Sequence, residues 1–454
     1  MLWVDEDYHL AAGIQTLHGK MLYRDVWYDK PPLNAWVYAA IGGIWGWPLR
    51  LFDALYVLAI CGVMYRFARN VWSEREGLFA AGLLAFFLNF DLAFAVVPIA
   101  PDLFMMLPHI AAVYLAWRGK PLAAGIACGV AFLFNTKALF IVPVCILLTW
   151  PGFPALVLGF TVPNVIAFAV LGAAGAFRDY LRQVWEWGVA YAKNSPVPNP
   201  AINALRRTVN WLGFHAAVVI AAAWFWRKEG RRTYFWIAVW TLLSLIAVAV
   251  GARFSPRYYF QLLPPIVLAA GRGLTLLIEQ PRTRVRSTVF AAIVIAAAVP
   301  LVRFGPRYAL IGRDLILGRE HKWSDLILDQ DSRAAADLVN ARAHPGDTLI
   351  EWGYRPDVFV YTRLTVGSRY WDSQPLTGVP ADRHLTGTDS IIPEWAAHNR
   401  RELTESKPTF IVDSLSVSNP LLAPGNYPEL RAWLENYRLV GKTSLSLIYK
   451  RKTP

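Results

Sequence analysis

The feature that most constrains this chain is a series of long apolar runs that carry almost no charge. They fill residues 31–303, whereas residues 304–454 have the composition of a soluble protein. Charged residues make up only 17% of the 454 residues, against about 25% in an ordinary soluble protein. A membrane helix needs about 20 apolar residues. The chain is therefore predicted to be a polytopic α-helical membrane protein with a small water-soluble domain at its C-terminus.

Aromatic and basic residues favour a membrane protein over a nucleic-acid-binding one. The chain has 20 Trp and 19 Tyr, whose rings prefer the headgroup interface. Its net charge of +13 would suit nucleic acid. The basic residues, however, gather in short clusters between apolar runs, where orientation signals belong. Acidic lipids or a phosphorylated lipid substrate are the expected partners, and nucleic acid is not.

About ten apolar runs are expected to cross the membrane. They lie near residues 51–69, 77–97, 102–117, 122–135, 137–150, 154–176, 213–226, 234–250, 256–278 and 287–303. The two between 122 and 150 are short and are separated only by Asn135, Thr136 and Lys137, so they are the weakest predictions. The expected organisation is an external segment (1–50), a helical membrane domain (51–303) and an extracytoplasmic α/β domain (304–454).

Orientation follows from the basic clusters. The four clusters are Arg66, Arg69 and Arg75; Arg118 and Lys120; Arg227, Lys228, Arg231 and Arg232; and Arg282, Arg284 and Arg286. An even number of predicted spans separates each cluster from the next, so all four fall on one face, which the positive-inside rule makes cytoplasmic. The loops near 98–101, 178–212 and 251–255, and everything after 303, then lie outside. We expect a multi-pass protein of the plasma (inner) membrane.

The same count places residues 1–50 outside. The apolar run 33–47 is short and contains Gly42, Gly43 and Gly46, so we expect it to lie along the surface or to re-enter. A first membrane helix is then expected to be missing from this chain, through a late start or a truncation. In the alternative interpretation, 33–47 crosses the membrane and the N-terminus stays inside.

Helix and strand patterns alternate in the C-terminal region. Residues 304–330 are expected to be a connector. Helices are predicted at 332–343, 356–364 and 427–437, strands at 347–353 and 408–414, and a strand or hairpin at 439–451. This alternation predicts a small α/β domain. It contains no glycine-rich phosphate loop, nucleophile elbow or metal-binding pattern.

The first candidate site residues are the acidic cluster Asp5, Glu6 and Asp7, which lies at the start of a short predicted amphipathic helix. His9 and His18 are expected on the surface of this helix. A basic and aromatic segment follows, from Lys20 to Lys30. Charged groups held beside apolar helices at a membrane face are costly unless they are paired or used, although a solvated, Asp-capped loop is the alternative.

A second acid, Asp102, lies at the mouth of an apolar helix on the same predicted face. Its alternative role is that of a helix N-terminal residue favoured by the helix dipole. Together Asp5, Lys30 and Asp102 offer carboxylates and a cation at one lipid–water boundary. A carboxylate there can take a proton from an attacking hydroxyl, and a lysine can neutralise a leaving phosphate.

The order acidic pair, short helix, G-x-x-x-Y-R-D and K-P-P-L resembles the first external loop of the GT-C glycosyltransferases. The resemblance is to the aminoarabinose transferase and protein O-mannosyltransferase-like group, with its RgtA/B/C/D-like members. Residues 255–271 and 347–364 resemble a late helix start and the external domain of that group. Its members take a sugar from a polyprenyl phosphate and place it on a hydroxyl acceptor outside the membrane.

The resemblance implies a role for each matching residue. Asp5 would be the general base, with Glu6 in support, and Asp102 would orient the acceptor or support the site. Lys30 would contact the lipid phosphate, and Arg257 would do the same unless it is an interfacial anchor.

No cofactor is expected, and no metal is assigned, because Asp29 has no clear histidine partner although some relatives place a metal near this position. A divalent cation stays open. The three cysteines, Cys61, Cys128 and Cys145, lie in apolar runs and are expected to be small buried residues.

The sequence thus predicts a polyprenyl-phosphate-sugar-dependent glycosyltransferase acting on a lipid, an envelope glycan or a protein. The alternatives are a lipid-linked glycan flippase or transporter, and a polysaccharide polymerase. Transporters usually carry ionisable residues near mid-membrane and internal repeats. Here the spans are nearly free of ionisable residues, Lys137 being the exception, and no repeat is visible. A polymerase would rely on large external loops between late spans, and only 178–212 is available.

Overall fold

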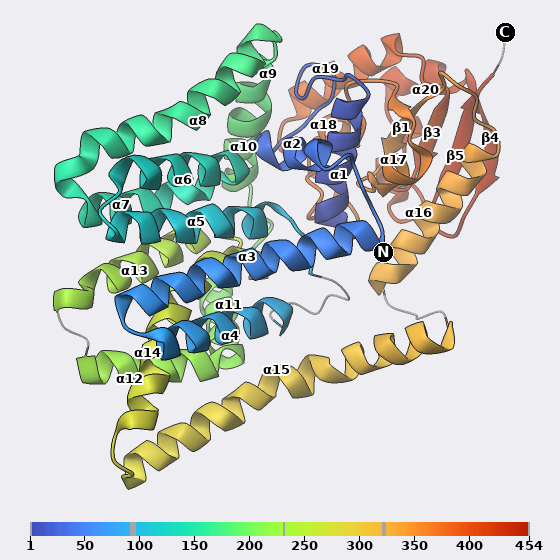
Figure 1. Cartoon of the computed structure of the whole chain (residues 1–454). Coiled ribbons are helices and arrows are strands. Elements are labelled where there is room, and N and C mark those ends of the chain that lie inside the picture. The colour runs from blue at the N-terminus through green and yellow to red at the C-terminus, as the bar shows by residue number, and fades with distance from the viewer. Residues whose placement is uncertain (1, 91–96, 230–231, 320–323, 453–454) are drawn as a thin grey trace. The chain divides into compact units, whose positions relative to one another are not determined.

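The computed structural model describes residues 2–90, 97–229, 232–319 and 324–452, and the chain divides into two units. The first, here called the sheet unit, comprises Met1–Leu49, Ala167–Pro196 and Lys322–Pro454. The second, the helical unit, comprises Arg50–Ile166 and Val197–His321. Figure 1 shows the elements of both units, and each unit is described by itself below.

The helical unit is built from apolar helices. They are α3 (Trp47–Val71), α4 (Glu74–Phe90), α5 (Pro101–Trp117), α6 (Pro121–Phe134), α7 (Val142–Leu148), α8 (Phe153–Ala173), α11 (Pro200–Phe214), α12 (Ala216–Glu229), α13 (Phe235–Ala249), α14 (Leu263–Glu279) and α15 (Arg284–Leu317), with α3 and α8 reaching into both units. Short 3-10 turns η1 (Thr136–Ile141), η2 (Trp150–Gly152), η4 (Arg232–Tyr234) and η5 (Pro256–Gln261) join some of them. Every apolar run predicted to span falls on helical structure, except that residues 91–96 lie outside the described residues.

Length and composition single out some of these helices as membrane spans. Among the described residues, 4 helices are long and apolar enough to cross a membrane, namely Trp47–Val71, Trp150–Ala173, Arg232–Ala249 and Arg284–Leu317. The pair α11 and α12, bent by 85°, gives a fifth if it is counted as one span. The other runs form shorter apolar helices, so the number of crossings stays a prediction.

Glycines let two of these helices touch backbone to backbone. A Cβ on Gly125 of α6 would lie 2.0 Å from the Leu156 carbonyl oxygen of α8, and one on Gly159 would lie 2.1 Å from that of Leu122. Small residues at helix contacts are typical of membrane proteins, where close van der Waals packing replaces hydrophobic burial. A side chain at either position would force α6 and α8 apart.

The helix that contains the last predicted span does not end at residue 303. Helix α15 continues without a break for 34 residues, through Pro300 and Pro306 (Figure 1). Proline is tolerated in membrane helices, so Pro306 does not end α15. The helix ends at Gly318, whose φ of 61° is left-handed, and the Arg319 amide donates to the Asp314 carbonyl at 2.9 Å.

The sheet unit contains a five-stranded sheet in the order β2-β1-β3-β5-β4. The strands are β1 (Thr348–Trp352), β2 (Thr365–Val366), β3 (Phe410–Asp413), β4 (Tyr437–Lys442) and β5 (Leu447–Arg451). Strand β1 pairs parallel with β2 and β3, while β5 pairs antiparallel with β3 and β4. The predicted α/β domain and its C-terminal hairpin are therefore present.

The helices of this C-terminal domain are α16 (Ser324–Asn340), α17 (Asp357–Thr362), α18 (Gln374–Thr377), α19 (Pro393–Glu405) and α20 (Pro428–Leu434). The sheet unit also contains α1 (Val4–Leu17), α2 (Leu33–Ala40), α9 (Phe177–Tyr180), the π-helical turn η3 (Leu181–Glu186) and α10 (Trp187–Lys193). Helix α2 has 8 residues, which span only about 12 Å at the helical rise of about 1.5 Å per residue. By itself it is too short to cross a membrane.

The strand order defines a particular edge of the sheet. The chain leaves β1 through α17 to form β2 on one side of β1, and it later forms β3 on the other side. In parallel sheets such a reversal creates a crevice at the carboxyl ends of the strands, where ligands commonly bind. Residues directly after β1 therefore lie at the edge best suited to a functional site.

Candidate active site

Helix α1 carries the acidic cluster in its first turn, where the helix dipole favours negative charge. The amides of Glu6 and Asp7 donate to the Trp3 carbonyl at 2.9 and 2.8 Å and start the helix. Asp5 is half-buried, whereas Glu6 and Asp7 are buried. The three neighbouring acids are thus placed in different environments.

The predicted amphipathic character of α1 is wrong, because nearly every residue from Glu6 to Gln15 is buried. The helix packs against both α2 and α17 and therefore has no long solvent-facing side. His9, predicted to lie on the surface, is only 2% exposed, and its Nδ1 lies 2.5 Å from the Tyr28 hydroxyl. His18, at the end of the helix, is exposed as predicted.

Lys30 lies beside a buried carboxylate. Its Nζ is 2.9 Å from Asp29 Oδ2, and the side chains of Lys30 and Asp29 are 40% and 7% exposed. The hydroxyl of Tyr23 donates to the Lys30 carbonyl at 2.8 Å, which fixes the backbone there. The ammonium group therefore remains accessible while its backbone and its carboxylate partner are held in place.

Tyr354, directly after β1, lies within electrostatic reach of carboxylates from three segments. Burial, and then the negative charges of Asp29, Asp5, Asp372 and Asp7, raise the pKa of its hydroxyl well above the usual value. The Tyr354 ring also contacts the ring of Tyr8 on α1, with centroids 5.3 Å apart. The structure thus brings Asp5 and Asp29 to the carboxyl end of β1.

Asp372 is a site residue that the sequence did not indicate. It is fully buried, and burial raises its pKa to about 8, with the Asp29 charge adding to the rise and the Lys30 charge opposing it. Among the described residues, Asp372 Oδ2 and Asp29 Oδ1 are buried without a hydrogen-bond partner. Lys30 is therefore the cation that two buried acids share.

Two glutamine side chains hydrogen-bond the N-terminal segment to distant parts of the sheet unit. Gln15 donates to the Leu364 carbonyl and accepts from the Val366 amide, both at 3.0 Å, so it pairs with β2 as a further strand would. Gln183, in the π-helical turn η3, donates to the Tyr23 carbonyl and accepts from the Tyr28 amide, both at 2.8 Å. Such π-turns are often found at functional sites.

A tryptophan of the C-terminal domain adds a third set of hydrogen bonds. Trp371 Nε1 donates to the Trp27 carbonyl at 2.7 Å, and the Trp27 amide donates to the Arg369 carbonyl at 2.7 Å. Segments far apart in the sequence therefore hold the loop between α1 and Lys30 in one conformation.

In the helical unit, Asp102 lies in the first turn of α5 and is 8% exposed. Its Oδ1 accepts a hydrogen bond of 2.9 Å from Asn135, which lies between α6 and η1. The Asn135 Oδ1 in turn accepts from the Lys137 amide at 3.0 Å. The short break that only separated two predicted spans therefore supplies a polar partner for Asp102.

Lys137 points at an aromatic ring. Its Nζ lies 2.9 Å from the centroid of the Tyr258 ring, a cation–π arrangement, and its charged neighbours are Asp102 and Arg253. Arg257, half-buried, lies on the same 3-10 turn as Tyr258. Asp102 and Lys137 thus come together with the segment that carries Arg257.

The five predicted site residues fall into two sets. The sheet unit holds Asp5, Glu6 and Lys30, and the helical unit holds Asp102 and Arg257. Among the described parts of the chain, no group of three or more His, Cys, Asp or Glu side chains is arranged to hold a metal ion. The three cysteines are buried and free, and Cys128 and Cys145 have sulfurs 3.7 Å apart.

Two kinds of comparison relate the chain to known proteins. Residues 29–173 match the family model described as dolichyl-phosphate-mannose-protein mannosyltransferase, PMT_2. The fold is similar to that of ArnT from Cupriavidus metallidurans bound to undecaprenyl phosphate, with a TM-score of 0.62 and 14% identity over 98% of this chain and 93% of that one. Apo ArnT gives a TM-score of 0.59 and 14% identity over 99% and 93%.

No protein with a curated description matches the sequence. The matched family range contains Lys30 and Asp102, whereas Asp5, Glu6 and Arg257 lie outside it. The structural likeness confirms the predicted fold, a multi-span helical membrane protein with a small C-terminal mixed sheet, similar to that of ArnT.

Proposed function

Because this chain is a multi-span membrane protein with a PMT_2 family segment at residues 29–173 and the ArnT fold, we propose that it is a GT-C glycosyltransferase. It takes a sugar from a polyprenyl-phosphate donor and transfers it to a hydroxyl acceptor at the outer face of the membrane. The observation that carries this proposal is the presence, in one structural unit, of the half-buried carboxylate Asp5 and the accessible cation Lys30.

Lys30 binds the donor phosphate. Its side chain is 40% exposed and its ammonium group is held beside Asp29, and charge-assisted hydrogen bonds to phosphate are among the strong ones. ArnT, which has the same fold, is described as bound to undecaprenyl phosphate. Arg257 supplies a second positive charge to the phosphate.

Asp5 is the general base. The acceptor hydroxyl gives its proton to the Asp5 carboxylate as its oxygen forms a bond to the anomeric carbon of the sugar. The bond between that carbon and the phosphate oxygen breaks, and polyprenyl phosphate leaves with its charge neutralised by Lys30. Glu6, fully buried behind Asp5 in the first turn of α1, supports it, and Asp102 orients the acceptor.

The product is a lipid, an envelope glycan or a protein that carries a hexose or a pentose. Residues 1–50 form the external catalytic segment, residues 51–303 the spanning helices and residues 304–454 the external domain, whose first part continues α15. The four basic clusters support this orientation.

Labelling of single cysteines tests the orientation. In a background lacking Cys61, Cys128 and Cys145, a membrane-impermeant maleimide should label His18→Cys and Arg401→Cys in intact cells, because both positions are exposed. Lys120→Cys, in a predicted cytoplasmic cluster, is the matched control and should be labelled only after lysis. Protection of His18→Cys or Arg401→Cys until lysis would contradict the proposal.

Donor turnover tests the activity. Purified protein in nanodiscs, supplied with a membrane extract of lipid-linked sugars and acceptors, should release free polyprenyl phosphate, measured by mass spectrometry. Lys30→Ala should lower donor affinity at least tenfold, while Lys30→Arg keeps part of it, because only the charge is retained. Unchanged affinity and turnover in Lys30→Ala would rule out phosphate binding by Lys30, and Lys193→Ala, an exposed lysine of the same unit, is the control.

A further inference from the structure

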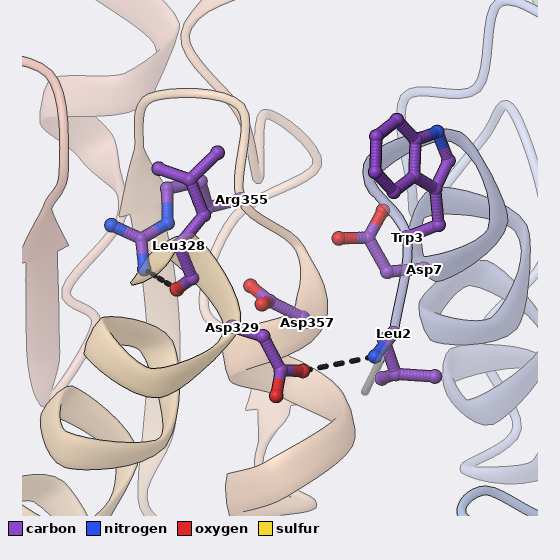
Figure 2. A pocket seen from close by; sticks show the side chains of 7 residues that line it. All are labelled: Leu2, Trp3, Asp7, Leu328, Asp329, Arg355 and Asp357. Atoms are coloured by element: carbon purple, nitrogen blue, oxygen red, sulfur yellow. Dashed lines mark hydrogen bonds between the residues drawn. The ribbon is translucent and has the colours of Figure 1, made fainter. Parts of the chain in front are cut away.

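A small cavity lies where α1 meets α16 and α17, and the reaction proposed above does not use it (Figure 2). Its volume is about 20 Å³, and its walls include the carboxyl groups of Asp7, Asp329 and Asp357. A polar cavity of this size holds about one water molecule. Three carboxyl groups around so small a space raise the question of which of them are ionised.

One of these acids is fully paired. Asp329 accepts hydrogen bonds of 2.9 Å from the Leu2 amide and from Arg333, and a further one from the Tyr361 hydroxyl. These partners hold the pKa of Asp329 below its usual value although burial alone would raise it. Asp329 is therefore ionised and contributes a fixed negative charge to the cavity wall.

Arg355 is the basic residue among those that line the cavity, and its guanidinium group is directed away from the cavity. Arg355 donates to Asp331 at 3.0 Å and to Ser332 at 3.0 Å, and Figure 2 shows its guanidinium turned toward Leu328 rather than into the cavity. Asp331 also accepts hydrogen bonds from Ser446 and from the Leu445 amide. Arg355 thus serves the contact between α16 and the sheet and neutralises Asp357 only in part.

Asp7 and Asp357 are paired less completely than Asp329. They are 2% and 4% exposed, and Figure 2 shows them among the residues that line the cavity, Asp7 on α1 and Asp357 on α17. Within the described structure, Oδ1 of each has no hydrogen-bond partner. Two ionised carboxylates in this position would repel each other in a medium of low dielectric constant, so one of them must hold a proton.

Titration of the two groups agrees with the geometry. Burial, followed by the negative charges of Asp357 and Asp5, raises the pKa of Asp7 well above its usual value. Burial raises the pKa of Asp357 to about 7, against the lowering effect of Arg355. The charged and titratable groups facing the pair are Asp5 and Glu6 on α1, Tyr354 and Arg355 after β1, Tyr361 on α17, and Asp329 on α16.

We propose that Asp7 and Asp357 share one proton across this cavity, and that the singly protonated pair positions α1 on the C-terminal domain. Both are positioning residues, since they act on the reaction through Asp5 and Glu6, which α1 carries. The effect on transfer rests on the proposed role of Asp5, but the proton sharing and the docking of α1 do not.

The pair makes the docking of α1 depend on pH in a definite direction. A carboxyl group with a raised pKa stabilises the folded state fully below its unfolded pKa, near about 3.9, and this contribution is lost as pH rises through the folded value. For Asp357 the loss occurs around pH 7, and for Asp7 it occurs at a pKa that is likewise raised well above the usual value. Once both carboxylates are charged, α1 loosens.

Hydrogen exchange of the full chain in nanodiscs tests the proposal without any substrate. In the wild-type protein, protection of the α1 amides, corrected for the intrinsic rate at each pH, should fall by up to about tenfold per pH unit above pH 7. Asn resembles a protonated Asp, so Asp7→Asn and Asp357→Asn should each remove this fall. Asp337→Asn, an exposed position on α16, is the matched control and should behave like wild type.

Two results would overturn the proposal. One is a fall in protection of the same size in wild type and in both Asn variants. The other is protection that is restored at high pH by added Na⁺ or Ca²⁺ in wild type alone, which would show that a cation bridges the two carboxylates. Either result leaves the proposed transferase activity standing, because turnover by Asp5 is measured separately. If one Asn variant fails to fold, the other supplies the same comparison.

Discussion

The sheet unit and the helical unit hold their polar site residues in different ways. In the helical unit, Asp102, Asn135 and Lys137 form a short chain of contacts among apolar helices. In the sheet unit, many buried polar groups from distant segments meet around Tyr354 and Lys30. Charged site residues are few in the helical unit and closely spaced in the sheet unit.

This difference decides what each unit contributes. A charge among apolar helices is costly unless it is paired or used, so a single ionisable residue there already indicates function. A crowded polar network instead fixes geometry, because each unpaired buried group is penalised and the network has few alternative arrangements. We infer that the polar network of the sheet unit fixes the segment between α1 and Lys30 in one conformation, whereas the helical unit holds a few isolated charges among its own helices.

Removing the Gln183 hydrogen bonds that hold the segment between α1 and Lys30 should give the larger loss of stability. Gln183→Ala leaves the Tyr23 carbonyl and the Tyr28 amide without their partner in a fully buried position. Each unsatisfied buried group costs about 1–3 kcal/mol, so the loss should be about 2–6 kcal/mol. Thermal unfolding in detergent measures it, with Gln280→Ala at the end of α14 as the control.

Asn135→Ala in the helical unit should lower the free energy of unfolding by less than Gln183→Ala does. Asn135→Ala removes a hydrogen bond to Asp102 and another from the Lys137 amide, which together contribute about 2–4.5 kcal/mol, the larger share from the bond to the charged group. The same unfolding measurement applies, with Asn203→Ala of α11 as a matched amide in that unit. A larger loss in Asn135→Ala than in Gln183→Ala would reverse the comparison between the two units.

Local patterns in the sequence predict the helices of the helical unit and most of the C-terminal elements. A long apolar run predicts a helix from its own residues alone, and the residue patterns of β1 and β3 predict strands in the same way. The continuation of α15 was missed because Pro306 and nearby arginines usually mark a helix end, whereas this helix passes through them. Strand β2 was missed because it has only 2 residues.

The candidate site could be predicted only in part. Asp5, Glu6, Lys30, Asp102 and Arg257 were named from their motifs, and their roles stay predictions. Gln183 and Asp372 could not be found, because their partners lie far away in the sequence; Gln183 meets Tyr28 across 155 positions. His9 was misplaced for the same reason, since α1 is covered by α2 and by distant α17.

The most direct test of the account is the transfer rate of Asp5→Asn. Asn keeps the shape of Asp5 but cannot accept a proton, and loss of a general base lowers turnover by about a hundredfold or more. Polyprenyl phosphate release should therefore fall at least that far in Asp5→Asn, with donor affinity and unfolding temperature near the wild-type values and Asp337→Asn unaffected. Transfer at the wild-type rate by folded Asp5→Asn would contradict the central claim that Asp5 is the base.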